Sequence, residues 1–252
     1  MYNAHSIQDQ KNLNTWFNNA IEFDVNFQVF LQPNSLTVPT EAHDYPEWHK
    51  GRVRYALWYL EIQDTELLDY LNQLRNQFAP YLFQPNTRQF HITLYICGFL
   101  LENKAQVHFD DDFSQQQFQQ QLERLKVLEL KPFHLKVGRL NSFSSALFLE
   151  IEDNENSLSK IRNLFSKSSQ EIAALNYCPH ITLGLYSQQF ESKKIFKIID
   201  SISPKTFEIS INQLSFGIYQ ANVLQGQLTT LHQFPLNQHH RENSQEIHSC
   251  CN

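Results

Sequence analysis

The tetrapeptide His-Ile-Thr-Leu occurs twice in this chain, at residues 91–94 and again at residues 180–183. Each copy ends the same predicted series of elements, an apolar strand followed by an amphipathic helix and then the histidine-bearing strand. The predicted elements are strands over 54–62 and 144–153 and helices over 64–78 and 156–175. The helices contain the similar segments LNQLRNQF and LSKIRNLF. A chain that repeats such a unit is expected to fold as two similar halves.

The spacing of the apolar residues supports an internal duplication. Ala56 precedes His91 by 35 residues (91 − 56), and Ala146 precedes His180 by 34 residues (180 − 146). Aligning the two alanines makes two aromatic residues equivalent, and we expect both in the core: Trp58 and Phe148.

The motifs place polar and aliphatic side chains on opposite faces of their strands. Strand side chains alternate, so the histidine and threonine of each motif share one face while its isoleucine and leucine share the other. The aliphatic face supplies the core, and the other face must contact something polar. Residues two apart on a strand are separated by roughly 6.5 Å, so both side chains can contact one phosphate-sized group. The same alternation puts Tyr95 and Tyr186 on the polar faces.

Two such strands suit acid–base chemistry at phosphorus. If the duplicated units pack about a pseudo-twofold axis, the two His-Thr pairs meet across a cleft. One group must then remove a proton and another must donate one, and histidine, with an ordinary pKa near 6.5, serves both roles. The threonine hydroxyls would hold the non-bridging oxygens. This scheme requires no metal and no cofactor.

The paired His-x-Thr motifs resemble those of the 2H phosphoesterase superfamily, which includes LigT-like 2′-5′ RNA ligases and cyclic phosphodiesterases. The resemblance covers about residues 50–235 and implies a bilobal α+β fold, with two antiparallel sheets lining a central cleft and helices outside. It implies that His91 and His180 are the acid–base pair and that Thr93 and Thr182 bind the phosphate. The implied substrates carry a 2′,3′-cyclic phosphate or a 2′-5′ linkage. Which histidine is the acid stays open.

Three further residues are candidates for substrate binding. Tyr95 and Tyr186 either stack on a base, as aromatic side chains do with splayed nucleotides, or simply pack at the edge of each half. Arg88, three residues before the first motif histidine, either contacts a phosphate or is an ordinary solvated charge.

Two other classes of function fit parts of the sequence. A duplicated structural histidine would leave a pseudoenzyme that binds a nucleotide without cleaving it. A cysteine- or metal-dependent hydrolase is disfavoured, because Cys178 and His180 stand about 6.5 Å apart on a strand, too far for the hydrogen bond that activates a thiolate. The histidines and cysteines near the C-terminus lack the spacing of a standard zinc site.

Composition limits the partners and the location. The formal net charge of −6 argues against a basic track for long double-stranded nucleic acid and favours a nucleotide or a short RNA end. No stretch has the length and hydrophobicity of a membrane helix, and residues 1–16 lack the pattern of an export signal, so we expect a cytoplasmic protein. We also expect a monomer. We expect an N-terminal extension over 1–45, a 2H phosphoesterase-like domain over 46–235 and a disordered tail over 236–252.

Overall fold

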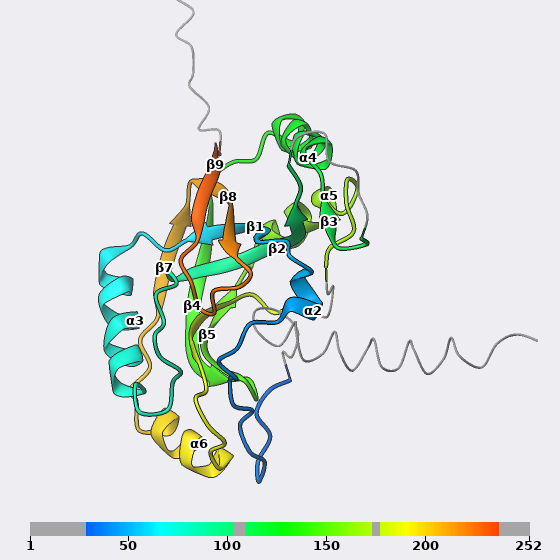
Figure 1. The fold of residues 1–252 in the computed structure, drawn as a ribbon. Helices are drawn as coiled ribbons and strands as arrows, with labels where there is room; N and C mark the ends of the chain where they lie inside the picture. The colour runs from blue at the N-terminus through cyan, green and yellow to red at the C-terminus, as the bar shows by residue number, and fades with distance from the viewer. Residues whose placement is uncertain (1–28, 103–108, 173–176, 237–252) are drawn as a thin grey trace, which may run out of the picture.

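The computed structural model describes residues 29–102, 109–172 and 177–236 (Figure 1). Residues 237–252 of the predicted disordered tail and most of the predicted N-terminal extension therefore lie outside the described residues, while Leu236, the first residue of that predicted tail, is buried in the main core. The helices and strands are α2 (Pro46–His49), β1 (Arg54–Glu61), α3 (Thr65–Gln77), β2 (His91–Leu100), β3 (Asp112–Phe113), α4 (Gln115–Leu128), β4 (Phe133–Ser142), β5 (Ala146–Glu152), α5 (Ser157–Phe165), β6 (His180–Leu185), α6 (Ser192–Asp200), β7 (Phe207–Ile211), β8 (Gln213–Gln220) and β9 (Thr229–Pro235).

The strands form one sheet with a pseudo-twofold arrangement. The strand order is β7-β4-β5-β6-β2-β1-β8-β9, with the short β3 pairing beside β2. The two motif strands, β6 and β2, lie at the centre and are antiparallel. Each is followed outward by the strand that begins its own copy of the repeat, β5 on one side and β1 on the other. The predicted α+β class and the antiparallel halves are confirmed, and the two predicted sheets are joined at the centre.

The two motif strands pair through a single residue of each. Ile92 of β2 pairs with Ile181 of β6, and both side chains are fully buried in the main core. These residues hold the same place in the two motifs, so the pseudo-twofold axis passes beside them. Beyond this pair other parts of the chain bond to the two strands: the Ile172 backbone N–H donates to the Ile96 carbonyl oxygen, and that of Phe83 donates to the Leu185 carbonyl oxygen.

The helices bury apolar stripes on the sheet face that carries the main core. In α3, the Asp64 side chain caps the helix by accepting from the Leu67 backbone N–H, which satisfies one of the unpaired donors of the first turn. The buried residues of α3 and α5 include apolar side chains at three- and four-residue spacing, namely Leu67, Leu71, Leu74, Leu158, Ile161 and Phe165. Burying one leucine is worth about 1.5–3 kcal/mol. Each helix packs against the motif strand of the other half, α3 against β6 and α5 against β2.

Both motif strands contain a β-bulge at the motif leucine. In the pairing of β1 with β2, Trp58 lies opposite Tyr95 and Tyr59 lies opposite Thr93, so Leu94 has no opposing residue. In the pairing of β5 with β6, Leu147 lies opposite Gly184 and Phe148 lies opposite Thr182, so Leu183 is the extra residue. An extra residue in one strand reverses the alternation beyond it. Side chains that follow the bulge therefore change faces relative to those that precede it.

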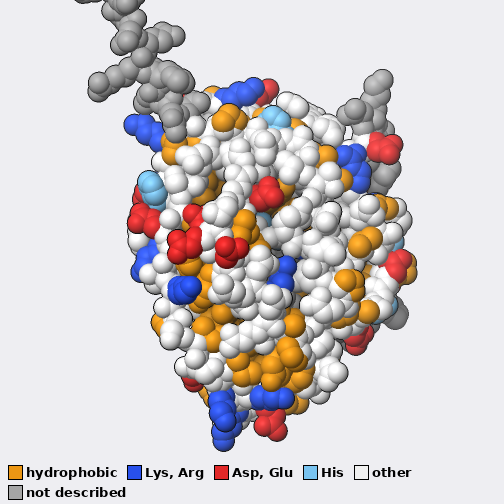
Figure 2. Space-filling view, turned by 90° about the vertical axis from the view of Figure 1, so that its left-hand side faces the viewer, with side chains coloured by type: hydrophobic (Ala, Val, Ile, Leu, Met, Phe, Trp, Pro, Cys, Tyr) orange, Lys and Arg blue, Asp and Glu red, His pale blue; other side chains and the backbone are white. Residues whose placement is uncertain are grey.

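The surface in Figure 2, which contains α3, carries mixed charges. Lys and Arg side chains are interspersed with Asp and Glu across this face and form no continuous basic track on it. Hydrophobic side chains gather toward its lower part. No helix in the described part of the chain is long and apolar enough to span a bilayer.

Candidate active site

The four motif side chains predicted to be functional lie on one face of the central strands. Because the Ile92 and Ile181 side chains enter the main core, their sequence neighbours project from the opposite face. His91 is 9% exposed, and His180, Thr93 and Thr182 are partly exposed, so all four are near the surface of this face. Because Ile92 and Ile181 are paired and both point into the core, both His-Thr pairs lie on the same face of the sheet, as the alternation predicted.

The register also sets which motif residues are neighbours. The two strands pair at Ile92 and Ile181, which hold the same place in the two motifs. Because the strands are antiparallel, His91 and Thr182 lie to one side of this pair, and Thr93 and His180 lie to the other. A group held between the strands can meet both pairs.

The two histidine rings are held in the same way. The Nδ1 atom of His91 lies 2.8 Å from the backbone carbonyl oxygen of Gln89, and the Nδ1 atom of His180 lies 2.8 Å from that of Cys178. A carbonyl oxygen only accepts hydrogen bonds, so Nδ1 is the donor in both rings. In the neutral ring the lone pair is then on Nε2. Both histidines are thus set to exchange protons through the same nitrogen.

Aromatic rings support each imidazole edge-on. The ring of His91 is 5.8 Å from that of Tyr59, while His180 is 5.1 Å from Phe143 and 5.4 Å from Phe148. Burial raises the pKa of Tyr59, so its phenol stays protonated, and its hydroxyl pairs with Thr230 Oγ1 at 2.7 Å.

These contacts correct the alignment of the repeat by one residue. Tyr59 lies opposite Thr93 and Phe148 lies opposite Thr182, so Tyr59 is the equivalent of Phe148. The predicted equivalence of Trp58 and Phe148 is wrong. Trp58 is in the main core as expected, where its Nε1–H donates to Gln121 Oε1. Because these strands are uniformly apolar, identical residues in the two copies do not determine how the copies align.

Tyr95 and Tyr186 do not line the site. They follow the bulges, so they enter the main core with exposures of 1% and 0%. The Tyr95 hydroxyl donates to the Ser169 carbonyl oxygen, and the Tyr186 hydroxyl pairs with Ser142 Oγ. Burial raises the pKa of both phenols. The prediction that they contact substrate is wrong, because it assumed regular alternation through the motifs, and the alternative of packing is correct.

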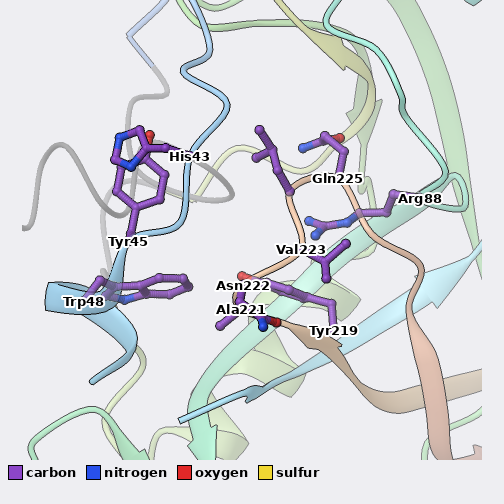
Figure 3. A pocket seen from close by; sticks show the side chains of 10 residues that line it. His43, Tyr45, Trp48, Arg88, Tyr219, Ala221, Asn222, Val223 and Gln225 are labelled. Atoms are coloured by element: carbon purple, nitrogen blue, oxygen red, sulfur yellow. The ribbon is translucent and has the colours of Figure 1, made fainter. Parts of the chain in front are cut away.

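Arg88 lies in a separate pocket (Figure 3). Its side chain is 7% exposed, its Nε–H donates to the Gly226 carbonyl oxygen at 3.0 Å, and its guanidinium carbon lies 4.2 Å from the centre of the Tyr219 ring. Trp48 and Tyr45 line the other side of this pocket, whose volume is about 370 Å³ including space open to solvent. Arg88 is therefore buried and structured, and the interpretation as an ordinary solvated charge is wrong. No signal in the sequence connected residues 43–48 with Arg88.

The Cys178 thiol near the site is not suited to act as a nucleophile. Burial raises the pKa of the Cys178 thiol, with a further contribution from the Glu150 carboxylate, which disfavours the thiolate that a cysteine nucleophile needs. Within the described residues no group of three or more His, Cys, Asp or Glu side chains is placed to hold a metal ion.

Comparisons with known proteins agree with the fold and with the family that the motifs resemble. The family model of the 2′-5′ RNA ligase superfamily matches residues 63–221, more than half of the chain. Among solved structures, Escherichia coli LigT complexed with 3′-AMP is similar with a TM-score of 0.52 at 13% identity, covering 74% of this chain and 99% of LigT.

Two other solved structures are similar over a comparable span. A phosphoesterase has a TM-score of 0.49 at 14% identity, covering 73% of this chain and 99% of that one, and a protein of Thermus thermophilus has a TM-score of 0.46 at 13% identity, covering 74% and 100%. No curated protein matches this chain in sequence. The likeness to LigT shows a shared fold, and the family match confirms the 2H phosphoesterase resemblance expected from the two motifs.

Proposed function

Since the chain belongs to the 2′-5′ RNA ligase superfamily, whose members are phosphoesterase- and ligase-type enzymes, we propose that it is a metal-independent phosphodiesterase. Its proposed substrates are 2′,3′-cyclic phosphates or 2′-5′ linkages in a nucleotide or at an RNA end. The observation that carries this proposal is the matched pair of histidines, each with Nδ1 on the carbonyl oxygen two residues before it. A two-histidine mechanism requires this matched arrangement, and turnover separates it from the pseudoenzyme alternative.

The proposed reaction uses the two Nε2 atoms in opposite roles. The neutral histidine removes a proton from water as the water oxygen bonds to phosphorus. The bond from phosphorus to the 2′ or 3′ oxygen breaks, and the protonated histidine donates its proton to that oxygen. The two histidines exchange protonation states in the process, so His91 and His180 can each be acid or base according to the direction of reaction. Ligation would follow the same path with an RNA 5′-hydroxyl in place of water: its oxygen bonds to the phosphorus of a 2′,3′-cyclic phosphate, the bond to the 3′ oxygen breaks, and a 2′-5′ linkage forms.

The threonines would stabilise the charge that develops on phosphorus. Thr93 and Thr182 share the face of the central strands that carries the two histidines, so their hydroxyls can donate to the non-bridging oxygens of a phosphate bound there. The four side chains would then surround the reacting phosphorus, with no step routed through a metal.

A nucleotide or a short RNA end is the proposed substrate. LigT was captured with 3′-AMP, which is a product that opening of adenosine 2′,3′-cyclic phosphate would give. The net charge of −6 fits a substrate bound in a local site better than long nucleic acid. The cytoplasmic location and the monomeric state expected from the sequence stay predictions.

Turnover by matched variants tests the proposal. Wild type, His91→Ala and His180→Ala are assayed with chelator present on 2′,3′-cyclic nucleotides and 2′-5′ dinucleotides, with His134→Ala, an exposed histidine of β4, as the control. We expect each motif variant to lose about 100-fold or more, as removal of a general acid or base typically costs, and the control to keep wild-type activity. Wild-type protein that binds a nucleotide but converts nothing would support the pseudoenzyme alternative instead.

A further inference from the structure

We propose that Arg75 and Arg162 are a reciprocal pair of positioning residues, each holding the His-Thr motif of the opposite half in its reactive shape. The proposal rests on the proposed function, because it assigns these arginines a role in the geometry of that site. Neither arginine touches the reacting atoms.

The two arginines are equivalent in the repeat and make equivalent contacts across it. They occupy the same place in the segments LNQLRNQF and LSKIRNLF of α3 and α5. Arg75 Nε–H donates to the carbonyl oxygen of Leu183 at 2.9 Å, and Arg162 Nη1–H donates to that of Leu94 at 2.8 Å. Leu94 and Leu183 are the two bulged residues. Each arginine thus reaches the bulge in the motif of the other half.

Each guanidinium also stacks on an aromatic ring that leads into the motif of its own half. The guanidinium carbon of Arg75 lies 3.8 Å from the centre of the Phe90 ring, next to His91 in sequence. That of Arg162 lies 3.7 Å from the centre of the Tyr177 ring, three residues before His180. One side chain in each half therefore contacts the motif of the opposite half and the segment that leads into its own motif. The two sets of contacts are related by the pseudo-twofold axis of the repeat.

The bulged carbonyl groups need partners from outside the sheet. The pairing of β2 with β6 is limited to Ile92 and Ile181, and a bulged residue falls out of the regular ladder of its strand. A buried carbonyl without a partner costs about 1–3 kcal/mol. Arg162 donates to the Leu94 carbonyl oxygen, and Arg75 donates to that of Leu183, which also accepts from Asn86 Nδ2 at 3.4 Å. Each of these carbonyl groups belongs to the residue directly after a motif threonine.

Neighbouring side chains complete the support on the β2 edge. The Tyr177 hydroxyl donates to the Thr93 carbonyl oxygen at 2.9 Å, and the Ile96 backbone N–H donates to Glu171. Glu171 in turn forms a two-point ion pair with Arg162, whose side chain is 14% exposed. The backbone from Thr93 to Ile96 is therefore fixed by side chains of the segment that leads into the second motif. A shift of this backbone moves the threonine hydroxyl and the histidine on the same strand.

Hydrogen exchange tests the crossed contacts without using activity. The variants are Arg75→Met and Arg162→Met, and the control is Arg124→Met, a partly buried helix arginine that donates to Ser168. We expect Arg162→Met to raise exchange in the peptide over 91–100 more than in that over 180–186, Arg75→Met to do the reverse, and the control to change neither. Equal changes in the two peptides, or changes confined to the mutated helix, would overturn the proposal. The same pattern is sought with Arg75→Lys and Arg162→Lys if the methionine variants do not fold.

Crossed double variants test whether the contacts position the catalytic groups. A misplacement of about 1 Å can cost about 100-fold in rate, so we expect Arg162→Met to lower kcat by about 10- to 100-fold. In a Thr93→Ala background, Arg162→Met should lower kcat by only about threefold or less. In a Thr182→Ala background, it should lower kcat by the same factor as in wild type. Arg75→Met should show the opposite preference. A merely structural role would give the same loss in both backgrounds and would refute the positioning role.

Failure of the proposed function gives a different result. Wild-type protein that converts no substrate in the panel counts against the phosphodiesterase proposal alone, because the exchange pattern is measured without substrate. In that case the crossed exchange pattern still decides whether the arginines hold the opposite motifs.

Discussion

Removing one hydroxyl group tests how strongly the backbone of the first motif depends on the second half. In Tyr177→Phe the ring that stacks on Arg162 is kept, and only the hydrogen bond to the Thr93 carbonyl oxygen is lost. A net hydrogen bond is worth about 0.5–1.5 kcal/mol, and an unsatisfied buried carbonyl costs about 1–3 kcal/mol, so we expect a loss of about 1–2 kcal/mol of unfolding free energy. In a chain of this size that lowers Tm by about 2–8 °C.

The expected effect on activity follows from the same energy. If the whole interaction serves to hold Thr93 in its reactive place, a loss of about 1–2 kcal/mol lowers kcat by about 5- to 30-fold at most. Calorimetry gives the loss of stability, and turnover of the cyclic-nucleotide panel gives the loss of rate.

Tyr95→Phe is the matched control for this variant. It also removes a tyrosine hydroxyl that donates to a backbone carbonyl oxygen, that of Ser169, which belongs to neither motif. We expect a similar loss of stability and an unchanged kcat. The reasoning is refuted if the two variants lose the same activity, or if Tyr177→Phe keeps both the stability and the kcat of wild type.

Three further predictions concern stability and are checked by urea denaturation. Gly98→Ala should cost about 2–4 kcal/mol, because Gly98 has φ +103° and an added Cβ would lie 2.2 Å from the Asp111 carbonyl oxygen, adding contact strain to a positive-φ cost of about 1–2 kcal/mol. Gln121→Leu should cost about 1–3 kcal/mol, because it leaves the buried Trp58 Nε1–H without its acceptor. Burial raises the pKa of Glu171 despite its ion pair, so the folded protein binds this proton more tightly than the unfolded chain. Relative to Glu171→Gln, wild type should lose stability as pH rises through the window above the ordinary glutamate pKa. A difference between the two that does not change across that window would contradict the stated direction.

The duplicated unit could be predicted from the sequence because its signals are local. The histidine and threonine of each motif are two residues apart and precede the bulge, so simple alternation placed them correctly on one face. Beyond the bulge the same rule failed, and Tyr95 and Tyr186 turned into the core. A bulge depends on how two strands pair, and neither strand contains a glycine or proline at the bulged position that would have marked it.

The supporting residues needed the tertiary structure. The similar segments of α3 and α5 showed that Arg75 and Arg162 are equivalent, but not that each one contacts the strand of the opposite half. Each arginine reaches the opposite half because α3 packs on β6 and α5 packs on β2. The hydrophobic periodicity of the sequence does not indicate this packing. The pocket of Arg88 likewise brings together residues separated by more than a hundred positions, such as Trp48 and Tyr219.

Each half contributes an arginine that contacts the motif of the other half, and this arrangement bears on how such a chain can originate. A homodimer made of one half would have the same contacts, since the arginine of each subunit would reach the motif of its twofold mate. Fusion of two gene copies would then preserve every contact at the site while freeing the copies to diverge. The unlike surroundings of the two histidines, Tyr59 beside one and Phe143 with Phe148 beside the other, are differences that a symmetric dimer of one gene product could not acquire.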